Sequence, residues 1–428
     1  DPAAPAETST ASTQIPCEVV SPRARGLYSA PEPASAASGW CPACHAGHFH
    51  RGHFHTGYLP IGRATRTLRY HSTRGDAPAL SFDDVMLTGL APDGGLYLPE
   101  RWPALDRQTL AGFAGRSYGQ VAAEVMRPFM AGSAVEGEID RLCAQAYGRF
   151  ARAGTCPLVQ IDEATWLLEL FHGPTLAFKD VAMQILGDLF DHVLAARGER
   201  ITIVGATSGD TGSAAIEACR GRENVDIVIL HPKGRTSEVQ RRQMTTVDAD
   251  NVHNVAVEGT FDDCQALVKA MFADENFRND VGLAAVNSIN FARILAQTVY
   301  YVTSAVALGA PHRPVNFAVP TGNFGNVFAG HAARKMGVPT RMLTVASNAN
   351  DILTRFFETG RMETQGVVPT HSPSMDIQVS SNFERLLFEL MDGDGHATAR
   401  EMQQFKQTGA FACSQGQLAR ARAGFDGF

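Results

Sequence analysis

The segment Ile201-Thr-Ile-Val-Gly-Ala-Thr-Ser-Gly-Asp-Thr-Gly212 has the pattern of a buried strand, a glycine-rich loop and the start of a helix. Residues 201–204 are all β-branched, which is typical of a strand covered on both faces. The first N–H groups of a helix are unpaired and lie at the positive end of its dipole. We therefore expect the loop that ends at Gly212 to bind a carboxylate or a phosphate.

The composition of this loop leaves other interpretations open. Thr207, Ser208 and Thr211 supply hydroxyl groups that suit an anion, but an ordinary strand–helix turn with a polar cap uses the same residues. No lysine follows the last glycine, so the loop is not a P-loop. A dinucleotide site would need an acidic residue about 20 positions further on, and Glu223 and Asp226 are the candidates.

Strands and helices alternate on both sides of this segment. Alternation of this kind indicates βαβ units and an α/β fold with helices on both faces of a largely parallel sheet. In such a sheet, ligands bind beyond the carboxyl ends of the strands. The predicted strands are 165–170, 201–205, 225–230, 316–319 and 341–346, and the predicted helices are 180–197, 211–219, 261–273, 291–308 and 327–336.

A second loop of the same design follows the predicted strand 316–319. Pro320-Thr-Gly-Asn-Phe-Gly-Asn326 again combines glycines with small polar side chains ahead of a helix. Two such loops in one parallel sheet predict a ligand with two anionic ends, or two ligands side by side.

A third segment places Lys179 where a helix begins, after the predicted strand 165–170 and beside the apolar residues 176–178. Desolvation and a helix N-terminus both disfavour a charged ammonium, and a lysine with a lowered pKa can form a Schiff base with an aldehyde. Taken alone, the segment also fits a surface lysine at a helix start. Pyridoxal phosphate, an aldehyde that carries a phosphate, would unite all three segments.

These segments and three others resemble the threonine synthase family. The resemblance runs from about Leu68 to the end of the chain, with the motifs in the family's order. It implies a tryptophan-synthase-β-like fold (fold type II of the pyridoxal-phosphate enzymes) with parallel sheets, helices on both faces and a small N-terminal α/β domain. The motifs are Tyr70-His-Ser-Thr-Arg-Gly75, Asp93-Gly-Gly-Leu-Tyr97, His172-Gly-Pro-Thr-Leu-Ala-Phe-Lys-Asp180, Ala206-Thr-Ser-Gly-Asp-Thr-Gly212, Asn287-Ser-Ile-Asn290 and Pro320-Thr-Gly-Asn-Phe-Gly-Asn326.

The resemblance also implies an activity. A threonine synthase is a pyridoxal-phosphate lyase that converts O-phospho-L-homoserine and water to L-threonine and phosphate, by β,γ-elimination and replacement, in the last step of threonine biosynthesis. We expect a cytoplasmic monomer or homodimer that binds this small molecule, with neither nucleic acid nor membrane as a partner. The net charge of −7 argues against a dedicated nucleic-acid binder. The chain also lacks an apolar run long enough to span a bilayer.

Site roles follow from the motifs that match the family. Lys179 is implied to be the Schiff-base lysine and the general base. The expected cofactor-binding residues are Lys179, Asp210, Gly322, Asn323, Phe324 and Asn326. The substrate carboxylate is expected on Thr207, Ser208 and Thr211, and the substrate phosphate on Asn287, Ser288 and Arg293. A guanidinium fork matches phosphate oxygens.

The two ends of the chain depart from the family pattern. Residues 1–67 are rich in Ala, Pro, Ser, Gly and His, a composition that does not form a core. We expect them to be a disordered extension that arises from a translation start assigned too early. We expect a threonine-synthase N-terminal domain at 68–158 and a catalytic core of two α/β subdomains at 159–428. The family usually continues beyond this C-terminus and supplies a hydroxyl group for the pyridine nitrogen, so we expect the chain as written to turn over poorly.

The cysteines do not suggest a disulfide scaffold. There are eight in 428 residues, and most stand singly, as buried reduced thiols of a cytoplasmic protein do. Cys41-Pro-Ala-Cys44 and the histidines that follow it are metal-ligand residue types. The fixed spacing of a zinc site is not evident there, and we expect no metal.

Three rival functions remain. One is another pyridoxal-phosphate lyase, such as a threonine or serine dehydratase or a phospholyase that acts on a related phospho-amino acid. The segment that contains Asn287 and Arg293 favours a phosphorylated substrate over the first two. The others are a dinucleotide-dependent dehydrogenase and an inactive chain that only binds the cofactor.

Overall fold

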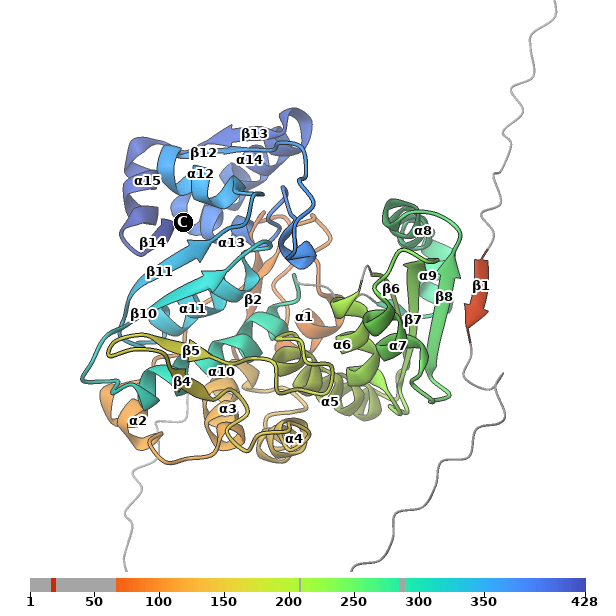
Figure 1. The fold of residues 1–428 in the computed structure, drawn as a ribbon, viewed down its shortest axis with the longest axis horizontal. Helices are drawn as coiled ribbons and strands as arrows, with labels where there is room; N and C mark the ends of the chain where they lie inside the picture. Colours follow the sequence, from red (N-terminus) through yellow and green to blue (C-terminus); the bar gives the residue numbers. More distant parts are fainter. Residues whose placement is uncertain (1–16, 21–66, 208, 285–288) are drawn as a thin grey trace, which may run out of the picture.

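Two separate, largely parallel sheets form the framework of the computed structural model, which describes residues 17–20, 67–207, 209–284 and 289–428 (Figure 1). The first sheet has the order β1-β8-β7-β6-β9, in which β1 runs antiparallel to β8 and the other pairs are parallel. The second sheet has the order β10-β11-β14 and is parallel throughout. The bounds are β1 Cys17–Val20, β6 Ile201–Ala206, β7 Val225–Pro232, β8 Val252–Val257, β9 Leu283–Ala284, β10 Val315–Pro320, β11 Thr340–Ala346 and β14 Phe425–Gly427.

Neighbouring residues of the first sheet pack on opposite faces, as the pleat of a strand requires. Ile203 and Ile229 join the main core, whereas Val204 and Leu230 join a smaller cluster with Cys264 of α8 (Phe261–Ala273). Helices therefore cover both faces, and the predicted α/β class with parallel sheets is confirmed. The other helices between β6 and β9 are α6 Asp210–Cys219, α7 Glu238–Thr245 and α9 Glu275–Asp280.

The two glycine loops do not belong to one sheet, so that expectation is wrong. The loop of Gly212 follows β6, and the loop of Gly322 follows β10 in the second sheet. Strand patterns locate strands, but they do not say which strands pair. Helices α5 (Asp180–Arg197) and α10 (Phe291–Ala307) lie between the sheets: α10 packs on α5 and α11 (Gly325–Lys335), and α5 packs on α6.

The predicted strand 165–170 is also not part of a parallel sheet. It forms β5 (Trp166–Leu168) in an antiparallel hairpin with β4 (Leu158–Gln160). The segment of Lys179 therefore reaches the site from a hairpin and not from a sheet edge. Sequence analysis also predicted no strand before residue 68, and β1 lies there.

The N-terminal part packs into the same core as the catalytic part. Tyr70 is fully buried, its ring centre is 5.2 Å from that of Phe291 in α10, and its hydroxyl donates to the Phe129 carbonyl at 2.7 Å. Ser81 caps α1, because its side chain accepts from the Asp84 N–H. The elements are β2 Tyr70–Ser72, α1 Phe82–Thr88, β3 Tyr97–Pro99, α2 Arg107–Gly112, α3 Tyr118–Met126, η2 Arg127–Met130 and α4 Ile139–Tyr147.

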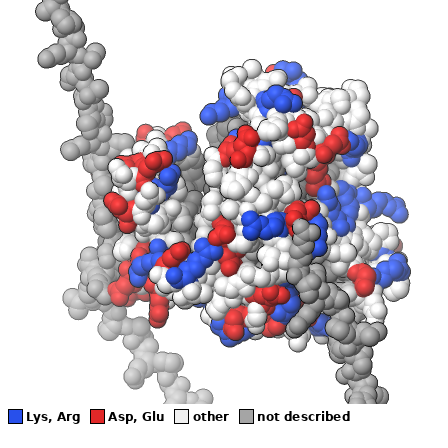
Figure 2. Space-filling model, turned by 180° about the vertical axis from the view of Figure 1, so that it is seen from behind, with Lys and Arg blue, Asp and Glu red and all other residues white. Residues whose placement is uncertain are grey.

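The part of the chain between β11 and β14 forms further helices and strands beside the second sheet. Between β11 and β14 the chain forms a two-stranded antiparallel sheet, one 3₁₀ helix and four α-helices. These are α12 Ile352–Thr359, β12 Arg361–Glu363, η3 Pro373–Met375, α13 Phe383–Leu390, α14 Gly395–Thr408, β13 Ala410–Ala412 and α15 Gln415–Arg422. Seen from behind in Figure 2, acidic and basic side chains mix over the surface.

Two further expectations concern composition. Within the described residues, no helix is both long and apolar enough to cross a bilayer. Five cysteines of the described residues are free: Cys143, Cys156, Cys219 and Cys264 are buried as expected, and Cys413 is partly exposed. The Cys41–Cys44 pair and its histidines lie outside the described residues, so the structure does not bear on them.

Candidate functional site

Lys179 meets the first glycine loop. It is the N-cap of α5, and its Nζ donates to Asp210 Oδ2 at 2.5 Å. Asp210 opens α6 directly after that loop. The two side chains are 12% and 28% exposed, respectively, so the pair lies mostly away from solvent. Two of the three segments singled out in the sequence therefore converge.

The charges around this pair shift both pKa values. Burial lowers the pKa of Lys179, Asp210 opposes that shift, and the positive charge of Arg293 adds to it. Burial alone would raise the pKa of Asp210, but the ammonium of Lys179 and a hydrogen bond from Ser374 bring it below its usual value. Lys179 thus gives up its proton more readily than an exposed lysine would.

The apolar residues before Lys179 suggest that they bury the lysine, but Leu176 in this turn does not. Leu176 is 68% exposed and has a left-handed backbone with φ of 61°, so it does not bury the lysine. The turn is held by the buried Asp180, which accepts from the Thr175 N–H at 2.8 Å and from its hydroxyl at 2.7 Å. A Cβ at Gly173 would lie 2.4 Å from that of Asp180, so a glycine is required there.

The threonines of the first glycine loop have different surroundings. Thr207 is buried, and its hydroxyl accepts from the N–H groups of Gly209 at 3.1 Å and Gly212 at 3.0 Å. It therefore holds the loop in shape. Thr211 lies partly exposed in the first turn of α6, whose N-cap residue, Gly209, has no side chain to supply a cap of its own. Ser208 lies outside the described residues.

The second loop presents another helix N-terminus without a side-chain cap. Phe324 is fully buried at the N-cap of α11, with a left-handed φ of 63°. Holding a bulky residue in this conformation costs about 1 kcal/mol or more, and its ring packs 5.3 Å from that of Phe383. The Asn326 side chain accepts from the hydroxyls of Tyr300 and Tyr301. Asn323 is partly exposed, and its carbonyl accepts from the Asn382 N–H at 3.0 Å.

Gly322 is required by a neighbouring segment that the sequence analysis did not single out. A Cβ at this position would lie 2.9 Å from Ile377 Cδ1 and 3.2 Å from Met375 Cα. The Gly322 carbonyl also accepts from the Ser380 hydroxyl at 2.8 Å. The segment 372–380 therefore backs the second loop directly.

Arg293 carries a buried charge that lacks a full set of partners. It lies in the first turn of α10, is 3% exposed, and its Nε has no hydrogen-bond partner among the described residues. Burial lowers its pKa to about 10, an effect that Asp210 partly offsets. Leaving a buried cation without partners is costly, so the geometry suits an anionic ligand. Asn287 and Ser288 lie outside the described residues.

Together these groups fit pyridoxal phosphate and a phosphorylated substrate. Lys179 offers a buried primary amine beside Asp210. The start of α11 offers N–H groups that no side chain caps, and Arg293 offers a desolvated guanidinium with an unpaired Nε. The aldehyde of the cofactor reacts with an amine such as that of Lys179, and phosphate groups bind to helix N–H groups and to a guanidinium.

Comparisons with known proteins agree with this geometry. The family model described as threonine synthase N terminus matches residues 69–147, and the model described as pyridoxal-phosphate dependent enzyme matches residues 153–424. The threonine synthase of Pseudomonas aeruginosa is 56% identical over 359 residues, which cover 84% of this chain and 76% of that protein. This chain belongs to the threonine synthase family. The resemblance seen in the motifs is thereby confirmed.

Solved structures of threonine synthases share the fold. The pyridoxal-phosphate-bound threonine synthase of Brucella melitensis has a TM-score of 0.83 and 54% identity, covering 85% of this chain and 78% of that one. The yeast threonine synthase has a TM-score of 0.80 and 42% identity, covering 84% and 76%. The protein is thus a fold type II enzyme with pyridoxal phosphate as its cofactor. It is a lyase that makes L-threonine and phosphate from O-phospho-L-homoserine and water.

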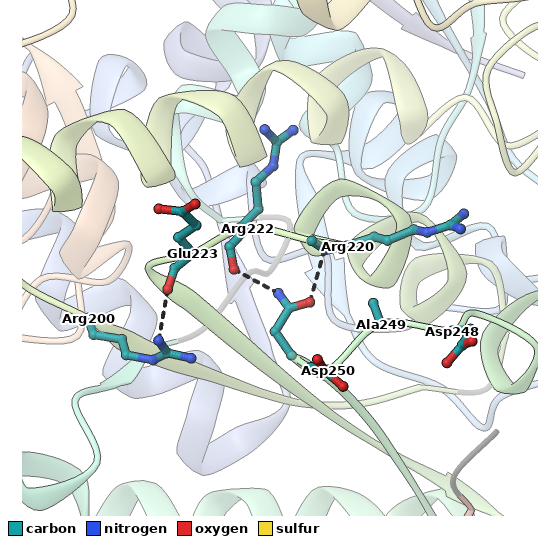
Figure 3. A pocket seen from close by; sticks show the side chains of 9 residues that line it. Arg200, Arg220, Arg222, Glu223, Asp248, Ala249 and Asp250 are labelled. Atoms are coloured by element: carbon teal, nitrogen blue, oxygen red, sulfur yellow. Dashed lines mark hydrogen bonds between the residues drawn. The ribbon is translucent and has the colours of Figure 1, made fainter. Parts of the chain in front are cut away.

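The dehydrogenase alternative fails on geometry. Asp226 is opposite Thr202 in the sheet, whereas the glycine loop begins at Thr207, roughly 16 Å further along the strand. Arg200 binds both acidic candidates at the far end of the sheet, donating to Asp226 Oδ2 and to the Glu223 carbonyl, each at 2.8 Å. Figure 3 shows this region, where Arg200 and Glu223 line a cavity of about 600 Å³ whose lining does not include Lys179.

Proposed function

We propose that this member of the threonine synthase family carries out its reaction where Lys179, Asp210 and Arg293 meet. The observation that supports this most is the 2.5 Å contact between Lys179 Nζ and Asp210 Oδ2. The charge of Arg293 acts on both of these side chains. The three groups come from α5, α6 and α10, so only the folded chain assembles them.

Pyridoxal phosphate, when bound, supplies an aldehyde for amines and a ring that accepts electrons from the substrate Cα. We assign its aldehyde to Lys179 and its phosphate to Gly322, Asn323, Phe324 and Asn326, at the start of α11. Asp210 lies beside the cofactor's point of attachment, because its carboxylate touches Lys179 Nζ. The left-handed backbone of Phe324 turns the chain into α11, which places the helix N-terminus at this loop.

Lys179 is also the base that removes the substrate Cα proton. A base needs a neutral amine, and both burial and Arg293 lower the pKa of Lys179 toward that state. Asp210 acts in the opposite direction, because its negative charge favours the proton on Nζ. The pair can therefore hold a proton at Nζ in one stage of the reaction and release it in another.

The substrate is oriented by its two anionic groups. Arg293 binds the substrate phosphate, together with Asn287 and Ser288. The start of α6 binds the carboxylate, with the hydroxyl groups of Ser208 and Thr211 beside it. The Thr207 hydroxyl holds this loop in shape through the N–H groups of Gly209 and Gly212. Because Arg293 is buried, a phosphate bound to it is shielded from water and is held firmly at low dielectric.

Two assays on the purified protein test this proposal. Phosphate and threonine should appear in equal amounts from O-phospho-L-homoserine, and no ammonia should be released from threonine or serine. Borohydride reduction followed by peptide mapping should place the pyridoxyl group on Lys179, and Lys179→Ala should lose it. A modified lysine elsewhere, or a dehydratase activity without threonine formation, contradicts the assignment.

The proposal also covers the domain organisation, the compartment and the oligomeric state of the enzyme. We assign residues 68–158 to an N-terminal domain and residues 159–428 to the catalytic core, in the cytoplasm, as a monomer or homodimer. The free buried cysteines are typical of a reducing compartment. Light scattering on the gel-filtered protein distinguishes one subunit from two, and a larger assembly contradicts the proposal.

A further inference from the structure

A serine from the far side of the site touches the same carboxylate oxygen as the catalytic lysine. Ser374, in η3, donates from its hydroxyl to Asp210 Oδ2 at 2.9 Å. That oxygen also accepts from Lys179 Nζ at 2.5 Å. Ser374 lies in the part of the chain between β11 and β14 of the second sheet, whereas Asp210 follows β6 of the first, so the bond joins the regions of the two sheets.

The segment that carries Ser374 is held by a network of side chains. Asp376 Oδ1 accepts from the Thr370 hydroxyl at 2.6 Å, from Asn348 Nδ2 at 2.8 Å and from Asn350 Nδ2 at 3.1 Å. Asp376 Oδ2 accepts from the Thr370 N–H at 2.9 Å. These bonds order a segment that is otherwise irregular, so Ser374 is presented from a defined frame.

The same segment packs against the second glycine loop. The space that a Cβ of Gly322 would need is taken by Met375 Cα and Ile377 Cδ1, at 3.2 and 2.9 Å. Residues 374–377 therefore contact the loop assigned to the cofactor phosphate and the carboxylate beside the lysine. A segment in this place can couple the positions of both.

We propose that Ser374 is a positioning residue of the threonine synthase reaction, which orients the Asp210 carboxylate toward the nitrogen of Lys179. This inference rests on the proposed roles of Lys179 and Asp210. A carboxylate with one fixed oxygen cannot rotate away from the lysine, so its charge acts on Nζ at the shortest range. Without the Ser374 hydroxyl the Asp210 carboxylate turns toward solvent, and it stabilises the protonated form of Lys179 Nζ less.

The direction of the effect follows from the groups around the lysine. Asp210 on α6 raises the pKa of Lys179, whereas burial and Arg293 on α10 lower it. If Asp210 is less well oriented, it opposes the pKa-lowering effects of burial and of Arg293 on Lys179 less strongly. The nitrogen should then lose its proton at a lower pH, by about half a unit if part of one charge-assisted hydrogen bond is lost.

The test uses the holoenzyme and three variants: Ser374→Ala, Ser374→Thr and Ser372→Ala. The pH at which the visible absorption band changes should fall by about half a unit in Ser374→Ala, on the scale of one weakened hydrogen bond. Ser374→Thr keeps the hydroxyl and should restore the wild-type value. Ser372→Ala is the matched control from the same segment. It should not move the band, because the Ser372 hydroxyl bonds to Thr370 and Asn348 and not to Asp210.

Kinetics separate positioning from a merely structural role. In Ser374→Ala, kcat should fall several-fold, its pH profile should shift with the band, and KM for O-phospho-L-homoserine should stay within twofold, because Arg293 is untouched. An unchanged band in Ser374→Ala, or an equal shift in Ser372→Ala, overturns the inference. If the wild-type enzyme carries no pyridoxyl group on Lys179 after borohydride, it is the proposed function that fails.

Discussion

Arg293 is the residue whose surroundings indicate a ligand most directly. Its Nε is unpaired and its side chain is 3% exposed, so the charge reduces the stability of the protein while the substrate is absent. Arg293→Leu should keep its full content of bound cofactor and weaken binding of O-phospho-L-homoserine by ~2–5 kcal/mol. Titration of the visible spectrum with substrate measures this loss.

Two observations support or contradict that role of Arg293. The Leu variant should melt no lower than wild type, because an apolar side chain suits the buried position. Arg293→Lys keeps a charge but lacks the fork that matches phosphate oxygens. Its affinity for O-phospho-L-homoserine should therefore lie between those of wild type and Arg293→Leu. An unchanged affinity for O-phospho-L-homoserine in Arg293→Leu contradicts the assignment.

At the scale of elements, the second glycine loop depends on the segment behind it. Gly322→Ala places a Cβ against Ile377 Cδ1 and Met375 Cα, and the loop must shift to relieve the contact. Cofactor occupancy should therefore fall while the protein stays folded, as absorbance per mole of protein will show. The double variant Gly322→Ala/Ile377→Ala removes one of the two contacts and should recover part of the occupancy. If it recovers none, the added methyl group crowds the cofactor itself.

The contact between α11 and α13 should make stability depend on pH. Glu389 accepts from His331 and Lys335, each at 2.8 Å. Burial would raise the pKa of Glu389, but these partners lower it to about 2. A carboxyl group whose pKa is depressed on folding adds stability above its unfolded pKa, ~4.3, and this stability is lost as the pH falls through the folded pKa.

The Glu389→Gln variant tests that dependence. At pH 7 it should unfold at lower urea concentration than wild type, with a loss of about 1–2 kcal/mol. The difference between the two proteins should shrink steadily from pH 5 toward pH 2, because the wild-type carboxyl group also loses its charge there. A difference that stays constant over this range contradicts the argument.

Local patterns predicted the elements well and the pairing of strands poorly. The periodicity of 180–197 and 261–273 gave the bounds of α5 and α8 as the structure has them, because helix signals lie within the helix itself. The assignment of both glycine loops to one sheet was wrong, since strand pairing is a tertiary property.

The candidate site likewise contains residues that local sequence patterns reveal and one residue that only the fold brings into place. Lys179 and the two loops stand in contiguous motifs, so the sequence revealed them. Ser374 is an exposed serine in an irregular segment, and its contact with Asp210 spans 164 residues. A nearby signal was the sequence Ser372-Pro-Ser-Met-Asp376, a proline between serines with an acidic residue after them, which is typical of an ordered turn.

At the scale of the whole molecule, the N-terminal part is joined to the site through α13. Glu384 of α13 accepts from the Thr73 hydroxyl at 2.6 Å and from Arg74 Nε at 3.0 Å. The next residue, Arg385, is fully buried and donates to the Ile289 carbonyl at 2.6 Å. Ile289 precedes α10, the helix that carries Arg293. The N-terminal part therefore helps to set where α10 begins.

Arg74→Met tests this connection, because it leaves the Glu384 carboxylate, 3% exposed, without its charged partner. We expect a loss of about 3 kcal/mol in the free energy of unfolding, as for other broken buried pairs, measured by urea denaturation. The double variant Arg74→Met/Glu384→Gln should recover at least half of that loss, since no charge is then left unpaired. Arg116→Met is the matched control: its 3.9 Å pair with Glu124 is partly exposed and should contribute under ~1 kcal/mol. If Arg74→Met costs no more than this control, α13 does not bind the N-terminal part through these charges.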